Sequence, residues 1–255
     1  MPPHLLIAKS AALALWAGGL ALLERLRPAS PRPPRSDGPR LAHNLGLWLS
    51  TVALSPLLTA PVSVIATQTN VWTRLPFLHD GWMVATDLLV LDLWIYFWHR
   101  ANHEWPPLWR FHEIHHRDVF LDASSGVRFH PGEVALSALA RVPLIIALDI
   151  PLTTVLAYDA IVTVAALFHH SNVRLPVGIE AALRHVVVTP SHHWVHHHAV
   201  RADTDSNYGT ALTIWDRLFG SWSPTRRTPE MEIGAENAPE LSLARLAIQP
   251  FRRRA

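Results

Sequence analysis

The chain has no cysteine, one lysine (Lys9) and few charged residues of any kind. Without cysteine it can form no disulfide, no thiolate zinc site and no cysteine-ligated iron–sulfur cluster, although this absence does not identify a compartment. Charged residues make up 16% of the 255 residues, against roughly 25% in an ordinary soluble domain. Because the apolar residues, at 49%, gather in long runs, the composition is that of a membrane protein.

A nucleic-acid partner is also a poor fit. The formal net charge is only +2, and the arginines lie in loops beside apolar runs, with no basic groove or recognition pattern. The sequence shows no internal repeat, no haem or iron–sulfur motif and no glycine-rich dinucleotide fingerprint. Any redox chemistry would therefore need electrons from another molecule.

Five apolar runs are candidates for crossing a bilayer, which takes about 20 helical residues. The first is interpreted as a retained span and not a cleaved signal peptide, because it has no small-residue cleavage site. The last two are short and form a hairpin with Asp149 and Pro151 at its tip, so the hairpin is either tilted or crosses only in part. The five runs are Leu5–Leu23, Leu45–Ala66, Trp82–Trp98, Val134–Leu148 and Leu152–Leu167.

The orientation follows from the segment Glu24–Arg40, a proline-rich loop after the first run. Its five arginines place it in the cytoplasm by the positive-inside rule; they are Arg25, Arg27, Arg32, Arg35 and Arg40. Counting spans from there returns the chain to the cytoplasm after Trp98 and again after the hairpin. We therefore expect an integral membrane protein whose histidines gather on the cytoplasmic face.

Histidine is abundant, although cysteine and cofactor-binding motifs are absent. Fourteen of the seventeen histidines lie between His99 and His198. Eight of them form three tight sets: His99 and His103; His112, His115 and His116; His193, His196 and His197. Neutral imidazole is a good ligand for iron, zinc, copper or nickel. Eight ligands are too many for one ion, so the pattern predicts a site for two metals.

The first set continues a helical stripe. Asp92, Tyr96, His99 and His103 recur at offsets of 4, 7 and 11 residues, which return to nearly the same side of a helix. We expect Asp92, which is costly within a membrane, to accept a hydrogen bond from an imidazole just outside the metals. The alternative is a carboxylate bonded to a neighbouring hydroxyl or backbone group.

The other two sets share the spacing HxxHH, which we expect to place three side chains on one helix face. His130 stands alone before Pro131, where a helix-capping or hydrogen-bonding role is the commoner outcome. His170 lies at the foot of the hairpin, and spacing alone does not decide whether it is a metal ligand. His192 and His198 flank the last set, and we expect them to face solvent or to lie just outside the metals.

These motifs resemble the fatty acid hydroxylase/sterol desaturase superfamily, and in particular its bacterial sterol desaturase branch. The resemblance runs from Asp92 to Gly220. It rests on these residues: Asp92, Tyr96, His99-Arg100 and His103; Trp109, His112 and His115-His116; Arg128-Phe129-His130-Pro131 and Glu133; His170-Ser171-Asn172; Thr189-Pro190, His193 and His196-His197; Asn207-Tyr208-Gly209; and Trp215 to Gly220.

The resemblance implies a membrane-bound non-haem di-iron oxidase that hydroxylates or desaturates a lipid with O₂. Its electrons would come from a cytochrome, ferredoxin or reductase. It adds His130 and His170 to the eight expected metal ligands, and Tyr96 and Asn172 to Asp92 as residues just outside them. Two departures concern local hydrogen bonding: Trp194 stands where the family often has arginine, and Arg117 and His198 where it often has a small hydroxyl residue.

The expected architecture is an all-α membrane bundle of about four to five spans, with a cytoplasmic histidine-rich helical cap that holds two metals. We divide it into membrane helices and loops (1–90), a catalytic domain (91–222) with the membrane hairpin 134–168, and a loose polar tail (223–255). Two other functions stay open. A zinc hydrolase would need a general base such as Glu104, Glu113 or Glu133. A metal transporter would need a polar path through the spans, where Asp87, Asp92 and Asp159 are the main ionisable residues.

Overall fold

The computed structural model describes residues 3–32, 37–69, 71–74 and 81–252, and within them it is all helical, with no strand. Arg35 lies outside these residues. The long helices are α1 (Pro3–Leu26), α2 (Asp37–Gln68), α3 (Gly81–Glu104), α5 (Pro131–Leu148) and α6 (Leu152–His170). The short ones are α4 (Pro106–His116), η2 (Ala123–Val127), α7 (Val177–Leu183), α8 (Pro190–His196), α9 (Arg201–Thr204), α10 (Ile214–Leu218), α11 (Leu243–Ile248) and η3 (Gln249–Phe251).

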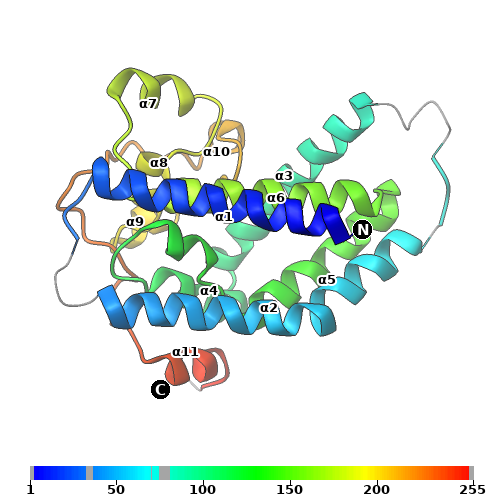
Figure 1. Ribbon diagram of the computed structural model, residues 1–255, viewed down its shortest axis with the longest axis horizontal. Coiled ribbons are helices and arrows are strands. Elements are labelled where there is room, and N and C mark those ends of the chain that lie inside the picture. The colour runs from blue at the N-terminus through cyan, green and yellow to red at the C-terminus, as the bar shows by residue number, and fades with distance from the viewer. Residues whose placement is uncertain (1–2, 33–36, 70, 75–80, 253–255) are drawn as a thin grey trace.

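Four of the described helices, α2, α3, α5 and α6, are long and apolar enough to cross a membrane. Their most apolar stretches are only 11% buried in α2 and 33% buried in α6. Helices that stay apolar on their outward faces need lipid around them. The predicted first run lies within α1, which packs beside α6 (Figure 1) and donates a hydrogen bond from Trp16 Nε1 to the Val164 carbonyl at 3.1 Å. Whether α1 crosses stays a prediction.

The hairpin of α5 and α6 is longer than predicted at the cap end. Pro131 opens α5 at its first turn, where a missing N–H is no loss, and Asp149 ends it with a left-handed φ of 50°. Ile145, Ile150, Val155 and Tyr158 then pack on Leu91 of α3 to form the core between the helices.

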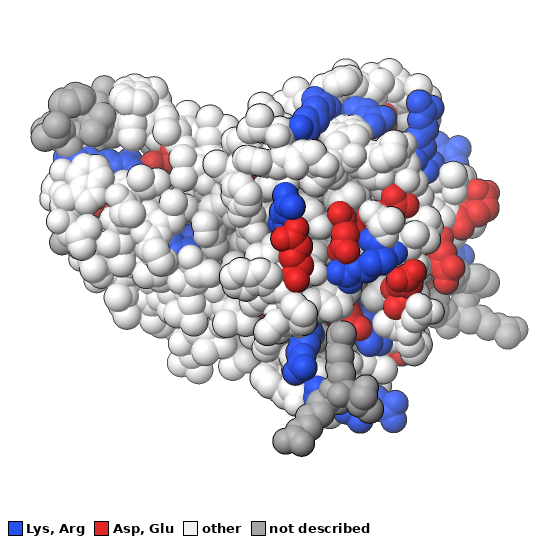
Figure 2. Space-filling view, turned by 180° about the vertical axis from the view of Figure 1, so that it is seen from behind, with Lys and Arg blue, Asp and Glu red and all other residues white. Residues whose placement is uncertain are grey.

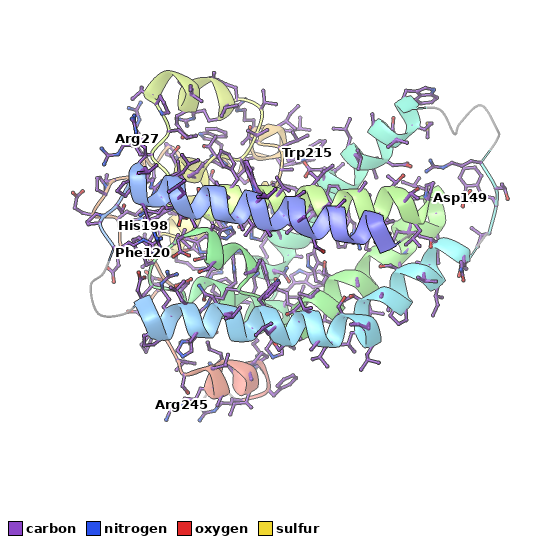
Figure 3. The ribbon with its side chains drawn as sticks, viewed as in Figure 1. Arg27, Phe120, Asp149, His198, Trp215 and Arg245 are labelled. Atoms are coloured by element: carbon purple, nitrogen blue, oxygen red, sulfur yellow. The ribbon has the colours of Figure 1, made fainter. Side chains whose placement is uncertain are left out.

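The two ends of the bundle differ. The ends of α1, α3 and α6 and the starts of α2 and α5 point to the side where α4, α8 and α9 form a cap (Figure 1). Asp149 lies at the other end, far from Phe120 and His198 in the cap (Figure 3). In the space-filling view, Asp, Glu, Lys and Arg gather over the cap half, and the other half is largely without them (Figure 2). This distribution of charge is the one expected of a membrane protein with a single cap outside the bilayer.

The end opposite the cap is closed by a buried ion pair. The guanidinium of Arg74, which follows α2, donates to both carboxylate oxygens of Asp87 at 2.9 and 2.7 Å. The Nε of Arg74 donates to the Leu148 carbonyl at 2.7 Å, and its backbone N–H donates to Asp149 at 3.1 Å. One arginine therefore ties α3 to the tip of the hairpin.

The C-terminal segment is not the loose tail that we expected. Leu246 of α11 is fully buried against Leu47 of α2 and Ile114 of α4. Glu240 accepts hydrogen bonds from His43 at 3.0 Å and from Arg128 at 3.3 Å. The polar composition of residues 223–255 concealed a few apolar anchors, which are enough to hold the segment on the cap.

Candidate metal centre

Nine buried histidines converge inside the cap in two neighbouring groups. The first group is His99, His103, His112, His116 and His196, and the second group is His115, His170, His193 and His197. Within each group one ring nitrogen from every histidine lies within 4.8 Å of those of the others. The rings come from α3, α4, α6 and α8, with His197 directly after α8. The fold therefore gathers all the expected ligands except His130.

Each HxxHH set is shared between the two groups, and our expectation of one common face was too simple. His112 and His116 join the first group, whereas His115 joins the second. His193 and His197 join the second group, whereas His196 joins the first. Side chains at i+3 and i+4 stand about 100° apart around a helix. Because of this angle, one helix can direct ligands toward two adjacent metal centres.

The rings meet at the spacing of metal ligands. The Nε2 atoms of His99 and His112 are 3.1 Å apart, and His170 Nε2 is 3.0 Å from the Nε2 atoms of both His115 and His193. Two nitrogens at right angles around one ion, each at about 2.1 Å from it, are about 3 Å apart. The geometry is that of imidazoles aimed at a common point.

Several rings are fixed from behind through their other nitrogen. The Nδ1 atoms of His99, His170 and His196 contact the carbonyl oxygens of Tyr208, Ala166 and Ser206 at 2.8, 2.7 and 2.6 Å. His115 Nδ1 contacts the Arg128 carbonyl at 3.2 Å. Since a carbonyl only accepts, each Nδ1 carries the proton, and the Nε2 lone pair faces the centre.

Other nitrogens of the groups are buried without any partner. These include both ring nitrogens of His116 and the Nε2 atoms of His103 and His196. A buried polar atom with no hydrogen bond is costly, and a metal ion removes that cost by taking the lone pair. The residues present therefore fit two metal ions held by nitrogen.

The protonation state agrees with this fit. Burial lowers the pKa of His115, His116, His193, His196 and His197 well below the usual value for histidine, and the neighbouring imidazoles lower it further. The rings are thus neutral at physiological pH, which is the form that binds metals.

The side chains of the three residues expected just outside the metals bond to groups other than imidazoles. Asp92 accepts hydrogen bonds from Tyr158 Oη at 3.0 Å and Trp215 Nε1 at 2.8 Å, as in our alternative, and the hydrogen bonds of the described residues join it to no imidazole. Tyr96 Oη contacts Ser221 Oγ at 2.8 Å. Asn172 joins Ser30 through hydrogen bonds of 2.8 and 2.9 Å. Their contacts hold the helices and loops that carry the ligands.

His130 is not part of either histidine group, and the ligand role that the resemblance implies stays a prediction. Its Nδ1 accepts a hydrogen bond from the Gly132 N–H at 2.9 Å and so caps α5, and its Nε2 contacts the Ala247 carbonyl at 3.0 Å. Capping is the role that its place before Pro131 suggested.

Sequence reasoning missed the part that two carboxylates play. Glu133 Oε1 accepts a hydrogen bond from His112 Nδ1 at 2.7 Å. Asp216, fully buried, contacts His192 Nε2 at 3.2 Å and accepts the Gly209 N–H at 3.0 Å, next to the Tyr208 carbonyl that holds His99. His192 is buried too and does not face solvent. Both carboxylates stand in the quoted motifs, but only tertiary contacts show their partners.

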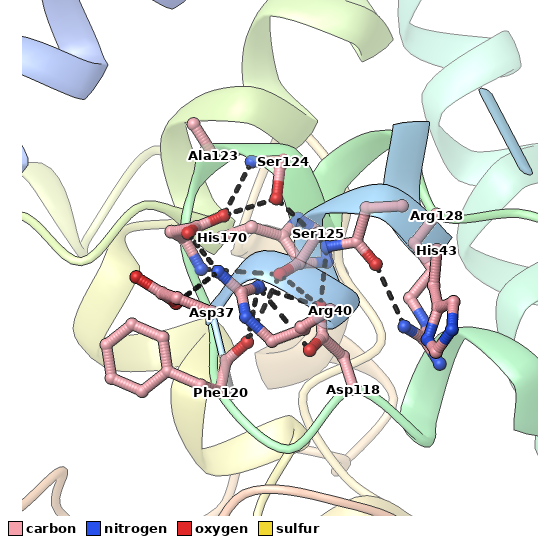
Figure 4. A network of polar contacts seen from close by, with 12 residues as sticks. Asp37, Arg40, His43, Asp118, Phe120, Ala123, Ser124, Ser125, Arg128 and His170 are labelled. Carbon is pink, nitrogen blue, oxygen red and sulfur yellow. Dashed lines mark hydrogen bonds and ion pairs between the residues drawn. The ribbon is translucent and has the colours of Figure 1, made fainter. Parts of the chain in front are cut away.

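A buried polar network fixes the second group from the side of α2 (Figure 4). Arg40, fully buried, forms ion pairs with Asp118, at 3.3 Å, and with Asp122. Asn44 donates to Asp118 at 2.9 Å and accepts from Arg128 at 2.9 Å. Since the carbonyl of Arg128 holds His115, the start of α2 is linked to a ligand of the second group.

Trp194, one departure from the family pattern, is buried between the network and the C-terminal segment. Its Nε1 donates to the Ser171 carbonyl at 3.3 Å, and the guanidinium of Arg227 lies 3.6 Å from its ring centre. Burial lowers the pKa of Arg227 to about 9. The family often has an arginine at position 194. In this protein an arginine lies beside Trp194, but it is Arg227 of the C-terminal segment.

Comparisons with known proteins agree with this site. The family model for fatty acid hydroxylases matches residues 84–221. The chain belongs to the fatty acid hydroxylase family. An ornithine lipid hydroxylase, OlsE of Rhizobium tropici, is 30% identical over 247 residues, which cover 92% of this chain and 73% of that protein. Alkylglycerol monooxygenase of Danio rerio is 28% identical over 197 residues, covering 74% of this chain and 43% of that protein.

The human alkylglycerol monooxygenase is 30% identical over 141 residues, which cover 55% of this chain and 31% of that protein. No match to a solved structure was found. All nine histidines of the two groups lie within the region that the family model matches. Together with the four apolar helices, the relationship makes this chain an integral membrane protein with a histidine-rich cap.

Proposed function

We propose that this protein is a membrane-bound di-iron oxygenase that hydroxylates a C–H bond of a lipid. The observation that carries the proposal is the pair of adjacent all-nitrogen groups, five histidines beside four. The groups share a boundary, where the rings of His116 and His197 stack with centres 4.3 Å apart. Two iron ions, one held by each group, would supply the activation of O₂ and the removal of hydrogen from an unactivated C–H bond.

The protein's own residues would hold and separate the ions. His103 and His116 belong to the first group, and His170 and His197 to the second. Hydrogen bonds from the Nδ1 atoms of His99, His115 and His170 to backbone carbonyls keep these rings in place. All nine rings are buried. Their burial would keep bulk water away from bound metals, so that the substrate and not water would be next to them.

A lipid substrate and hydroxylation are supported by the relatives, whose names describe a hydroxylase of an ornithine lipid and monooxygenases of alkylglycerols. Desaturation is the second outcome of the same chemistry. We propose that electrons come from a separate cytochrome, ferredoxin or reductase. The arginines after α1 support a cytoplasmic cap in a bacterial inner membrane.

The contacts of three carboxylates disfavour a zinc hydrolase. Glu104 pairs with Arg100 at 2.7 Å, Glu113 pairs with Arg117 at 2.8 Å, and Glu133 is bonded to His112. Each is engaged by a neighbour, whereas a general base must face a metal-bound water.

A transporter is disfavoured in the same way. Asp87 pairs with Arg74, Asp92 is bonded to Tyr158 and Trp215, and Asp159 pairs with Arg141 at 2.7 Å. These fixed contacts do not form a continuous polar path along the described helices.

Lipid mass spectrometry of cells with and without the protein tests the proposal. We expect one lipid class to gain the mass of one oxygen, and we expect this product to disappear in His103→Ala and His170→Ala while the protein still inserts in the membrane. Unchanged lipids in aerobic, iron-replete cells that contain the folded protein contradict the proposal. A loss of two hydrogens assigns the desaturase outcome instead.

A further inference from the structure

A surface hollow of about 520 Å³ lies between α7 and α10, outside the histidine groups. It is lined by Ala181, Arg184, His185, Arg217 and Trp222. Neither the two histidine groups nor the hydrogen bonds that fix them use these side chains. We call it the arginine hollow.

Two guanidinium groups meet over one indole in the arginine hollow. The guanidinium carbons of Arg184 and Arg217 lie 4.9 and 4.5 Å from the ring centre of Trp222. The ion pairs of the described residues include neither arginine. Arg217 donates to the carbonyls of Arg184 and His185 at 2.9 and 3.0 Å. Both cations are therefore held against one indole, and no ion pair of the described residues balances them.

Contacts with α3 place the arginine hollow at the membrane boundary. Tyr96, which contacts Ser221, lies eight residues before the end of α3, or about 12 Å along the helix. The ring of Phe219 lies 4.9 Å from that of Phe97 on the same membrane helix. The segment that carries Arg217 and Trp222 thus runs beside the last turns of a membrane-crossing helix.

The two helices beside the arginine hollow, α7 and α10, carry exposed apolar side chains, and Val186 follows the lining residue His185. Val177 is 87% exposed, Val186 60% and Leu218 66%, with Ile179 and Ile214 about half exposed. Such a surface beside a membrane helix is covered by lipid tails when it lies in the interface. Arginines rooted in it extend their charged ends to the level of the headgroups. In Figure 2, arginine atoms gather along the top of the charged half, the side on which α7 lies.

We propose that the arginine hollow binds the headgroup of an anionic phospholipid. The planar fork of Arg184, for which the described residues provide no hydrogen-bond partner, matches the oxygens of a phosphate. Arg217, whose terminal nitrogens donate to backbone carbonyls, adds a second positive charge beside it. Trp222 holds both forks by stacking and is itself a residue favoured at membrane interfaces. The bound lipid would fix the cap to the bilayer along α7 and α10. This site is distinct from the one that binds the lipid to be oxidised, and it stands whether or not the chemistry proposed above is correct.

The test is native mass spectrometry of the delipidated protein in neutral detergent, with added dioleoylphosphatidylglycerol. We expect one tightly retained lipid per chain, and weaker retention of zwitterionic dioleoylphosphatidylcholine. Arg184→Gln should lower phosphatidylglycerol retention about five-fold. Among the described contacts, the side chain of Arg184 makes only the stacking contact with Trp222, so this variant should fold. Arg217→Gln removes the other positive charge of the hollow and should also lower phosphatidylglycerol retention.

The matched control is Arg245→Gln, an exposed arginine of α11. Arg245 lies on the opposite side of the molecule from α7 (Figures 1 and 3). It removes the same charge, and lipid retention should not change. Equal retention in Arg184→Gln, Arg245→Gln and the unaltered protein overturns the proposal. Displacement of the lipid by inorganic phosphate at equal concentration also overturns it, because the hollow would then recognise a free anion and not a lipid headgroup.

Discussion

His112 and Glu133, on different helices, are joined by a hydrogen bond of 2.7 Å between Nδ1 and Oε1. Both side chains are buried, and His112 faces the first histidine group with its other nitrogen. A carboxylate behind a metal-binding imidazole fixes the orientation of the ring and raises its basicity. In this protein it also locks the start of α5 against α4.

Changing Glu133 should therefore weaken metal binding without unfolding the protein. We expect Glu133→Gln to lower metal affinity roughly 10- to 100-fold, because an amide accepts the imidazole proton less strongly. Metal retained after dialysis against graded chelator measures this. Glu104→Gln, at an exposed carboxylate paired with Arg100, is the control and should retain metal as the unaltered protein does. Equal retention in both variants would contradict the assigned role of Glu133.

The division into two groups can be tested one group at a time. His103→Ala removes a ligand from the first group, and His170→Ala removes one from the second. Each variant should retain about one of two metals, because the intact group keeps its own set of nitrogens. Both should lose oxygenase activity. Elemental analysis of the folded variants measures the metal. A variant that retains both ions, or loses both at once, would argue against two separate groups.

His130→Ala should separate stability from metal content. His130 caps α5 and belongs to neither group. Losing a cap costs about 1 kcal/mol, so the midpoint of thermal unfolding in detergent should fall while the metal content stays unchanged. His112→Ala is the contrasting variant and should lose metal. A clear loss of metal from folded His130→Ala would restore the ligand role that the family resemblance implied.

Arg40 should be among the least replaceable residues of the cap. It is fully buried with Asp118 and Asp122, and its removal leaves Asp118 without this cation and Asp122 with Arg32 at 3.5 Å. Breaking a buried ion pair in this way costs about 3–5 kcal/mol. We expect Arg40→Met to lower the unfolding temperature strongly, which circular dichroism can follow in detergent. Arg245→Met, at an exposed site, should have little effect. Similar unfolding temperatures would show that the network does not stabilise the cap.

Sequence reasoning was most successful where a local pattern decides the structure. The apolar runs predicted five spans, and four of the described helices are long and apolar enough to cross a membrane. The motifs indicated the family. Eight of the nine grouped histidines were found from their spacing, because i, i+3 and i+4 positions on a helix lie near one another, and the family resemblance added His170. Those patterns need no knowledge of distant contacts.

The remaining features depend on contacts between distant segments. The division of His112 and His115 between two groups is set by where α6 and α8 lie around α4. The partners of Asp92 are Tyr158 and Trp215, 66 and 123 residues away along the chain. The burial of Leu246 needs the groove between α2 and α4 that receives it. Spacing along one helix contains none of this information.

Anomalous diffraction at the iron absorption edge, on crystals of the iron-loaded protein, tests the central claim most directly. We expect two separate peaks, one among His99, His103, His112, His116 and His196 and the other among His115, His170, His193 and His197. A single peak shared by all nine rings, or iron bound outside both groups, would contradict it.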